Sequence, residues 1–162
     1  MHKMRRFKQE LSAEETLAIL ERGTSGVLAL SGDDDYPYAV PISYVYTDNK
    51  LIFHSAKSGH KIDSIMRNEK ASFCVIDQDE IIPEKYTTYF RSAIAFGKIR
   101  ILEDPAEIRE AISLLAGKYR PGHEDDREKE INAEFQALCV LVMDIDYMTG
   151  KEAIELVRRK NV

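Results

Sequence analysis

Hydrophobic positions recur with two different spacings in the first third of the chain, and the change of spacing separates a helix from strands. Over residues 13–22 apolar side chains repeat every three or four positions, as on one face of a helix. Ser12 and Glu15 form a capping box before this stretch and Gly23 follows it, so we expect a helix there. From residue 26 the repeat shortens to two, which predicts three consecutive antiparallel strands at 26–31, 38–47 and 51–55.

Three later apolar stretches predict further strands, at 71–77, 86–102 and 137–146. An acidic loop containing Pro83 is expected after the first of these. Pro41 cannot donate to a strand ladder, so the strand that contains it is expected at a sheet edge or with a bulge. Gly97 predicts a bulge in the long strand.

Helical spacing returns in three places after the first strands. A short helix is expected over 59–67 with Ser58 as its cap, and a longer one from Asp104 to about Gly117. Another helix is expected near 125–136. Strands that follow one another, with helices between only some of them, favour an α+β barrel over an alternating doubly wound sheet. With 162 residues, we expect one domain over 1–162.

Composition and charge narrow the function classes. The 28 acidic and 23 basic residues give a net charge of -5 without a basic stripe, which disfavours nucleic acid as a partner. The longest apolar run, ALCVLVM, is too short to cross a membrane, and no export signal is recognisable. Cys74 and Cys139 lie in apolar runs rather than in a CxxC pair, which indicates free thiols, although a bridge between them stays open. We therefore expect a cytoplasmic protein without a membrane span.

The stretch LIFHSAKSGHKID, residues 51–63, carries the strongest chemical signal. The first backbone N–H groups of a helix lack intrahelical partners and face the positive end of the helix dipole, so they form an anion site. Glycine there lets a ligand approach the backbone closely. The side chains that add hydroxyl groups or positive charge around this turn are Ser55, Lys57, Ser58, His60 and Lys61. Together they favour a phosphate, and the alternative is a solvated surface helix whose cations oppose the dipole.

Other chemistry has less support in the sequence. His54 and His60 are six residues apart and lack a third neighbouring ligand, so we do not expect a metal site. Walker, GxGxxG and nucleophile-elbow patterns are absent.

The ordered series GVLAL, YAVPISYVY, LIFHSAKSGHKID, NEKASFCV and YFRSAIAFGKIRIL resembles the FMN-binding split-barrel proteins related to pyridoxamine 5'-phosphate oxidase, in the branch of the nitroimidazole-resistance flavoproteins. The resemblance covers about residues 5–150. It implies a six-stranded antiparallel split barrel with peripheral helices, which forms a homodimer with FMN at the subunit interface.

The resemblance also implies a set of FMN-binding positions. Val40, Pro41, Ile42, Ser43 and Tyr44 would line the isoalloxazine ring, and His54, Ser55 and Ala56 would follow the flavin and ribityl chain. His60 and Lys61 would hold the phosphate beside Gly59, while Arg91 and Ser92 would reach the same FMN from the partner subunit.

This chain departs from a true pyridoxamine 5'-phosphate oxidase at the substrate positions. It has AVPISYVY where an Arg-x-x-x-Leu-Lys strand would stand, it ends in AIELVRRKNV, and it contains no Trp. The segment TGKE, residues 149–152, is expected to be a turn that starts a helix, and closure over the site is the alternative.

Two functions remain open from the sequence. The first is an FMN-dependent oxidoreductase that reduces a small molecule such as a nitroimidazole or another nitroaromatic. The second is a non-catalytic binder of FMN or haem. For the enzyme, the hypothesis is that His54 acts as a proton donor beside the flavin, in a partly apolar setting made by Phe53 and the tyrosines of YVY. The competing hypothesis is that His54 only hydrogen-bonds the flavin edge or a backbone carbonyl.

Overall fold

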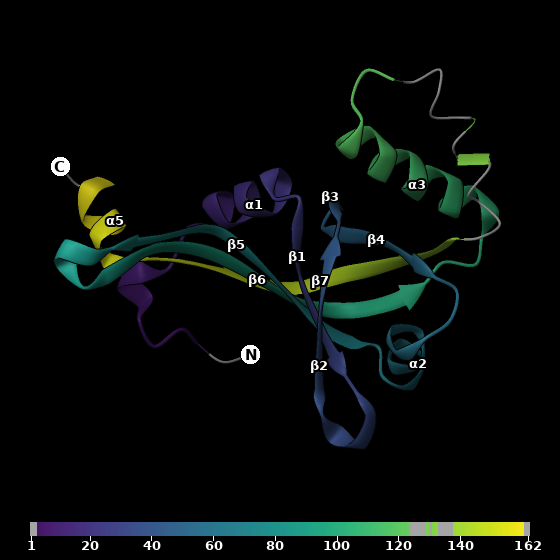
Figure 1. Cartoon of the computed structure of the whole chain (residues 1–162), viewed down its shortest axis with the longest axis horizontal. Helices are drawn as coiled ribbons and strands as arrows, with labels where there is room; N and C mark the ends of the chain where they lie inside the picture. The colour runs from purple at the N-terminus through teal and green to yellow at the C-terminus, as the bar shows by residue number, and fades with distance from the viewer. Residues whose placement is uncertain (1–2, 124–128, 130, 133–137, 161–162) are drawn as a thin grey trace.

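The computed structural model describes residues 3–123, 129, 131–132 and 138–160. Within these residues, the chain folds as an α+β split barrel built on one antiparallel sheet in the order β2-β1-β5-β6-β7-β4-β3 (Figure 1). The strands are β1 (Ser25–Ser31), β2 (Pro37–Ser43), β3 (Val45–Thr47), β4 (Lys50–Ala56), β5 (Lys70–Ile82), β6 (Thr87–Ile101) and β7 (Leu138–Glu152). The edge strand β2 also approaches β4, so the sheet curls towards closure.

Four described α-helices accompany the sheet. They are α1 (Ala13–Arg22), α2 (His60–Arg67), α3 (Pro105–Tyr119) and α5 (Ile154–Lys160). Short 3-10 turns occur at Phe7–Gln9, Asp33–Asp35 and Pro83–Lys85. The predicted capping box of α1 is confirmed, and the side chain of Asp104 caps α3. The helix expected near 125–136 falls largely outside the described residues.

The count of seven strands differs from the expected six because the stretch 38–47 divides at Tyr44. This side chain is completely buried and packs edge-on against the ring of Phe73, 4.8 Å away. Its hydroxyl donates to the carbonyl of Leu20 at 2.7 Å. Because the ring is drawn into the core, the backbone leaves the β2 ladder and resumes as β3. The predicted edge position of Pro41 is confirmed, since among the described strands β2 pairs with β1 alone.

Two strand ends predicted from the sequence were wrong. The acidic loop expected after residue 77 is strand, because β5 continues to Ile82 and pairs with β6 as far as Thr87. TGKE is also strand, since β7 continues to Glu152 and Lys151 pairs with Ser92. Both extensions belong to an arm, formed by the far ends of β5, β6 and β7, that projects from the barrel with α5 near its tip (Figure 1).

The pairing of β6 with β7 is irregular at Gly97, as predicted, but the bulge lies on β7 and not in the long strand that contains the glycine. Phe96 pairs with Tyr147 whereas Gly97 pairs with Ile145, so the extra residue, Asp146, lies on β7. A Cβ added at Gly97 would lie 1.9 Å from the carbonyl oxygen of Asp144. The close approach of the two backbones explains why glycine is needed here.

Successive side chains along β4 point either into the barrel or towards α3. Leu51 and Phe53 belong to the main core inside the barrel, while Ile52 belongs to a second cluster that α3 covers. Successive strand residues point to opposite faces. His54 therefore shares the α3 face with Ile52, and Ser55 shares the inner face with Phe53.

Candidate functional site

The junction between β4 and α2 leaves the start of α2 open. The residue at the cap position is Gly59 with φ 119°, and no side chain caps the helix, so the expectation that Ser58 is the cap was wrong. Gly59 is needed because L residues rarely adopt this φ. Beyond the adjoining residues, no atom of the described part of the chain lies within 4 Å of a Cβ built at Gly59, so the space beside the turn is open. The first N–H groups of α2 are therefore available to a ligand.

Lys61 lies beside this open turn. Its ammonium group donates to the hydroxyl of Ser55 at 3.1 Å. Burial lowers the pKa of Lys61, and the neighbouring Cys139 thiol opposes this shift. Among the described residues no carboxylate pairs with this half-buried ammonium, so a bound anion would stabilise it by replacing the lost hydration.

His60 is held by an aromatic contact. Its ring stacks on Tyr38, with centroids 4.1 Å apart and an interplanar angle of 24°. Its Nε2 lies 3.6 Å from Oδ2 of Asp33, and the other carboxylate oxygen of Asp33 pairs with Arg67 at 2.9 Å. The stack fixes the imidazole at the mouth of the site.

These groups line a shallow pocket of about 560 Å³, which we call the anion pocket. Its lining residues are Tyr38, His54, Ser55, Ala56, Ser58, Gly59, His60, Lys61 and Leu138. Six of the residues expected around FMN are thus brought together: His54, Ser55, Ala56, Gly59, His60 and Lys61. Tyr38 and Leu138 were missed. The only sequence signal for Tyr38 was its spacing of two from Val40, which places both side chains on the same face of the strand.

His54 also lines a second pocket, beneath the C-terminal half of α3. This pocket has a volume of about 210 Å³, and we call it the α3 pocket. Its lining residues are His54, Ile112, Leu115, Ala116, Tyr119 and Leu138. The expected apolar setting of His54 therefore exists, but α3 and β7 supply it. Phe53 lies on the opposite face of β4, in the core.

The positions expected along the flavin ring lie mostly away from both pockets. Val40 and Ile42 pack on the main core, and Tyr44 is inside it. Pro41 is exposed and Ser43 half-buried on the edge strand β2. The side chain of Tyr44 is therefore not available to a ligand bound to this chain.

Arg91 and Ser92 lie in the arm. Arg91 donates through Nε and Nη2 to Glu152 at 3.2 and 3.1 Å, and it lies 3.6 Å from Asp77. Glu152 is only 2% exposed and also accepts from Lys160 at 2.7 Å. Strand β7 runs from Leu138 at the anion pocket to Glu152 at Arg91, roughly 45 Å along the strand at about 3.3 Å per residue. One chain therefore cannot bring Arg91 and Lys61 to one ligand.

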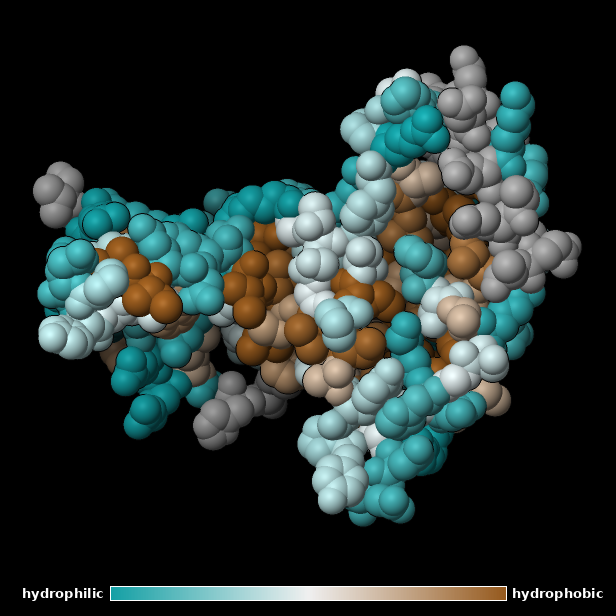
Figure 2. All heavy atoms as spheres, viewed as in Figure 1, coloured by the Kyte–Doolittle hydropathy of each residue, from teal (hydrophilic) through white to brown (hydrophobic). Residues whose placement is uncertain are grey.

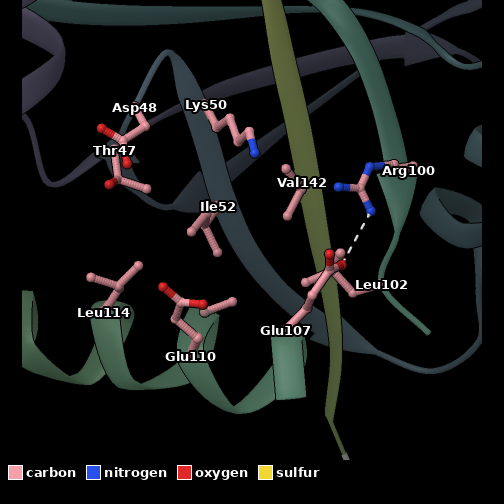
Figure 3. A pocket seen from close by; sticks show the side chains of 11 residues that line it. Thr47, Asp48, Lys50, Ile52, Arg100, Leu102, Glu107, Glu110, Leu114 and Val142 are labelled. Carbon is pink, nitrogen blue, oxygen red and sulfur yellow. Dashed lines mark ion pairs between the residues drawn. The ribbon is translucent and has the colours of Figure 1, made fainter. Parts of the chain in front are cut away.

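A third pocket, between α3 and the β3–β4 hairpin, has a different character. Figure 3 shows charged side chains over an apolar floor, with Arg100 3.7 Å from Glu107. Lys50 and Glu110 also line it, and its volume is about 160 Å³. The two ends of α3 thus face a charged pocket and an apolar one.

Three further sequence expectations can be compared with the described residues. Within them, no group of three or more His, Cys, Asp or Glu side chains is placed to hold a metal ion. Cys74 and Cys139 are both free thiols, as predicted. None of the described helices is both long and apolar enough to cross a membrane.

Comparison with known proteins identifies the family. The pyridoxamine 5'-phosphate oxidase family matches residues 12–152, and the chain belongs to this family. An uncharacterised protein of Rhizobium meliloti is 30% identical over 156 residues, covering 91% of this chain and 96% of that protein.

Two solved structures share the fold. One is a candidate 5-nitroimidazole antibiotic resistance protein from Bacteroides thetaiotaomicron, with a TM-score of 0.72 and 21% identity over 88% of this chain and 86% of that one. The other is an FAD- and haem-binding protein from Mycobacterium smegmatis, with a TM-score of 0.73 and 23% identity over 90% of this chain and 73% of that one.

Proposed function

We propose that this protein is an FMN-binding flavoprotein that reduces small nitroaromatic compounds. The observation that carries the proposal is the uncapped start of α2, where free backbone N–H groups, Gly59 and Lys61 converge. In contrast, Ser12 and Asp104 cap α1 and α3 with their own side chains. At α2, a phosphate would accept hydrogen bonds from the first backbone N–H groups, as the capping side chains do at α1 and α3.

The residues present fit the phosphate of FMN. Gly59 gives space for close approach, the Lys61 ammonium and Ser55 hydroxyl already lie together, and His60 is fixed by Tyr38. Bound FMN, once reduced, would supply the two electrons that a nitro group takes up with two protons as it becomes a nitroso group and water. The family and the resistance-protein neighbour support this reaction class.

The protein's contribution is to bind, orient and supply a proton. Lys61 and the α2 turn would hold the phosphate, which fixes the direction of the cofactor. His54 lies on the adjoining wall, where it lines both the anion pocket and the α3 pocket. From this position its imidazole would donate a proton to a substrate oxygen.

We further propose a homodimer that completes the site. Arg91 and Ser92 are too far from the anion pocket of their own chain, so a second copy would have to place its arm there. Figure 2 shows apolar side chains at the surface over the middle of the sheet, between the arm and α3. Val27 and Ile76 are among the large hydrophobic residues that remain exposed in the single chain. A second copy would cover such a face.

Binding without catalysis is the second candidate. The structural neighbour that binds FAD and haem motivates it, together with the position of His54 against an apolar pocket, since an exposed imidazole could ligate a haem iron. The two free thiols fit a reducing compartment, and we propose a cytoplasmic location.

An absorption spectrum of the purified protein tests the cofactor directly, because flavin and haem absorb differently. The chain should then be titrated with FMN, FAD and riboflavin. We expect riboflavin to bind much more weakly than FMN, because it lacks the phosphate. Equal affinity for the two would overturn the phosphate site. Anaerobic mixing of the reduced, FMN-loaded protein with 2-methyl-5-nitroimidazole tests the reaction. If no nitro compound reoxidises the flavin, the proposed reduction is wrong and binding without catalysis is the remaining candidate.

A further inference from the structure

Among the described residues, the lining of the α3 pocket is aliphatic apart from one imidazole and one tyrosine. Its walls are Ile112, Leu115 and Ala116 from α3 and Leu138 from β7, with Tyr119 at the helix end. Its volume of about 210 Å³ is larger than the ~150 Å³ at which an aliphatic cavity admits a benzene ring. The pocket therefore has room for one small aromatic ring.

The α3 pocket adjoins the anion pocket. Both are lined by His54 and Leu138, which lie on the paired strands β4 and β7. A molecule in the α3 pocket and a cofactor in the anion pocket would therefore meet at His54. The imidazole lies at the boundary, where a proton would be transferred.

The wall of the α3 pocket is fixed by contacts at the end of the helix. The hydroxyl of Tyr119 accepts from the backbone N–H of Tyr44 at 2.9 Å and donates to the carbonyl of Thr24. Lys118 donates to the carbonyl of Gly23, and its ammonium lies 4.4 Å from the centroid of the Tyr44 ring. These contacts direct the charged end of Lys118 to other partners, so it does not line the α3 pocket.

We propose that the α3 pocket binds the acceptor and that α3 restricts it to uncharged aromatic rings. The inference rests on the proposed function, because it names the substrate class of that same site. A carboxylate in this pocket would lose hydration, and none of the described residues that line the pocket is a lysine or an arginine to compensate, which costs binding free energy. The charged pocket at the other end of α3 provides a contrast, because Lys50 and Arg100 line that pocket and could pair with a carboxylate.

The wild-type protein gives the first test. Nitrobenzene and 4-nitrobenzoate share one ring and differ in one negative charge. Each is titrated into the oxidised, FMN-loaded protein, where no turnover occurs, and the methyl signals of Ala116 and Leu115 are followed by ¹³C NMR. Nitrobenzene should shift both signals and bind at least tenfold more tightly than 4-nitrobenzoate. Equal binding, or nitrobenzene binding without shifts at these methyl groups, would overturn the proposal.

A filled pocket gives the second test. Ala116→Phe places a ring in the α3 pocket, and Ser113→Phe is its matched control because Ser113 lines neither the α3 pocket nor the anion pocket. Ala116→Phe should weaken nitrobenzene binding at least tenfold and leave FMN affinity within about twofold, while Ser113→Phe changes neither. If Ala116→Phe lowers FMN affinity as strongly as nitrobenzene affinity, the pocket holds the flavin and the proposal is wrong.

The two proposals fail in different ways. If the chain binds no FMN but nitrobenzene still shifts the Ala116 and Leu115 signals of the apoprotein, the proposed function fails and the aromatic pocket stands. If FMN binds and the reduced flavin is reoxidised by nitro compounds while the Ala116 and Leu115 signals do not move, the acceptor does not bind in the α3 pocket and the proposed function stands.

Discussion

The hydroxyl of Tyr119, at the end of α3, accepts the backbone N–H of Tyr44 at 2.9 Å, at the point where β2 gives way to β3. The break in the strand leaves this N–H with only a long contact of 3.4 Å to the carbonyl of Thr24. Tyr119 thus gives a hydrogen-bond partner to the backbone N–H of Tyr44, which leaves the β1–β2 ladder because the Tyr44 ring is buried in the core. The same tyrosine lines the α3 pocket, so the strand break and the proposed acceptor site depend on one residue.

Tyr119→Phe should destabilise the protein by on the order of 1 kcal/mol, because the Tyr44 N–H loses its better partner. Urea unfolding measures the loss. Tyr86→Phe is the control, since Tyr86 is 100% exposed, and it should leave the midpoint unchanged. Equal midpoints for Tyr119→Phe and the wild type would show that the hydrogen bond adds nothing.

Lys61→Ala should weaken FMN binding by about 1.5–3 kcal/mol, the usual contribution of a charge-assisted hydrogen bond. Riboflavin affinity should change much less, because the contact is to the phosphate. Isothermal titration measures both ligands. Lys57→Ala removes a nearby, exposed charge that does not line the anion pocket, and it should have a smaller effect. Equal losses in the two variants would indicate a general electrostatic effect.

His54→Gln separates proton donation from hydrogen bonding. Glutamine can hydrogen-bond but cannot act as the acid, so we expect reoxidation of the reduced flavin by a nitroimidazole to slow by a factor of about 10² or more, with FMN affinity little changed. Anaerobic stopped-flow absorbance measures the rate. An unchanged rate would make His54 a binding residue.

Asp77 should make stability depend on acid pH. Hydrogen bonds from Arg22 at 2.6 and 2.7 Å lower the pKa of Asp77 below its ordinary value of 3.8. The stabilisation is then fully present above pH 3.8 and is lost as the pH falls through the lower, folded-state pKa. Asp77→Asn should be less stable than the wild type at pH 7, and urea midpoints should show this difference shrinking in acid. A constant difference from pH 7 to pH 2 would contradict the linkage.

Sedimentation of the purified protein should give twice the chain mass of 18.5 kDa. Ile76→Lys should favour the monomer, because Ile76 is a large, exposed apolar side chain on β5 and a charge there opposes burial against a second copy. Met66→Lys, on α2, is a control at a somewhat more exposed apolar side chain and should leave the dimer intact. A wild-type monomer with full FMN occupancy would overturn both the dimer and the shared site.

Local patterns were enough to predict most of the fold. The capping box of Ser12 and the alternation in β1 and β4 depend on neighbouring residues, so they can be read from the chain. The glycine marks the position of the bulge at Gly97, but the need for it comes from the backbone of Asp144 on β7. The end of β5 could not be predicted from the sequence, because its polar residues resemble a loop unless their pairing with β6 is known. The same holds for TGKE, which is strand because β6 continues beside it.

The candidate site was predictable only where it is local. The turn from Ser55 to Lys61 is one continuous segment, and the structure keeps these residues together. The apolar neighbours of His54 come from α3, more than fifty residues later, and no spacing in the sequence relates them. Tyr44 shows a further limit, because its place in the alternation does not reveal that its ring turns into the core.

The length of the β6–β7 ladder has a consequence for genetics. In the proposed dimer each site takes its phosphate-binding turn from one chain and Arg91 from the other. A chain altered at Lys61 and a chain altered at Arg91 would each form two defective sites alone. Mixed in one dimer, they would leave one site with both residues intact and concentrate both defects in the other. Two alleles of this gene that separately abolish function could therefore complement each other in a single cell.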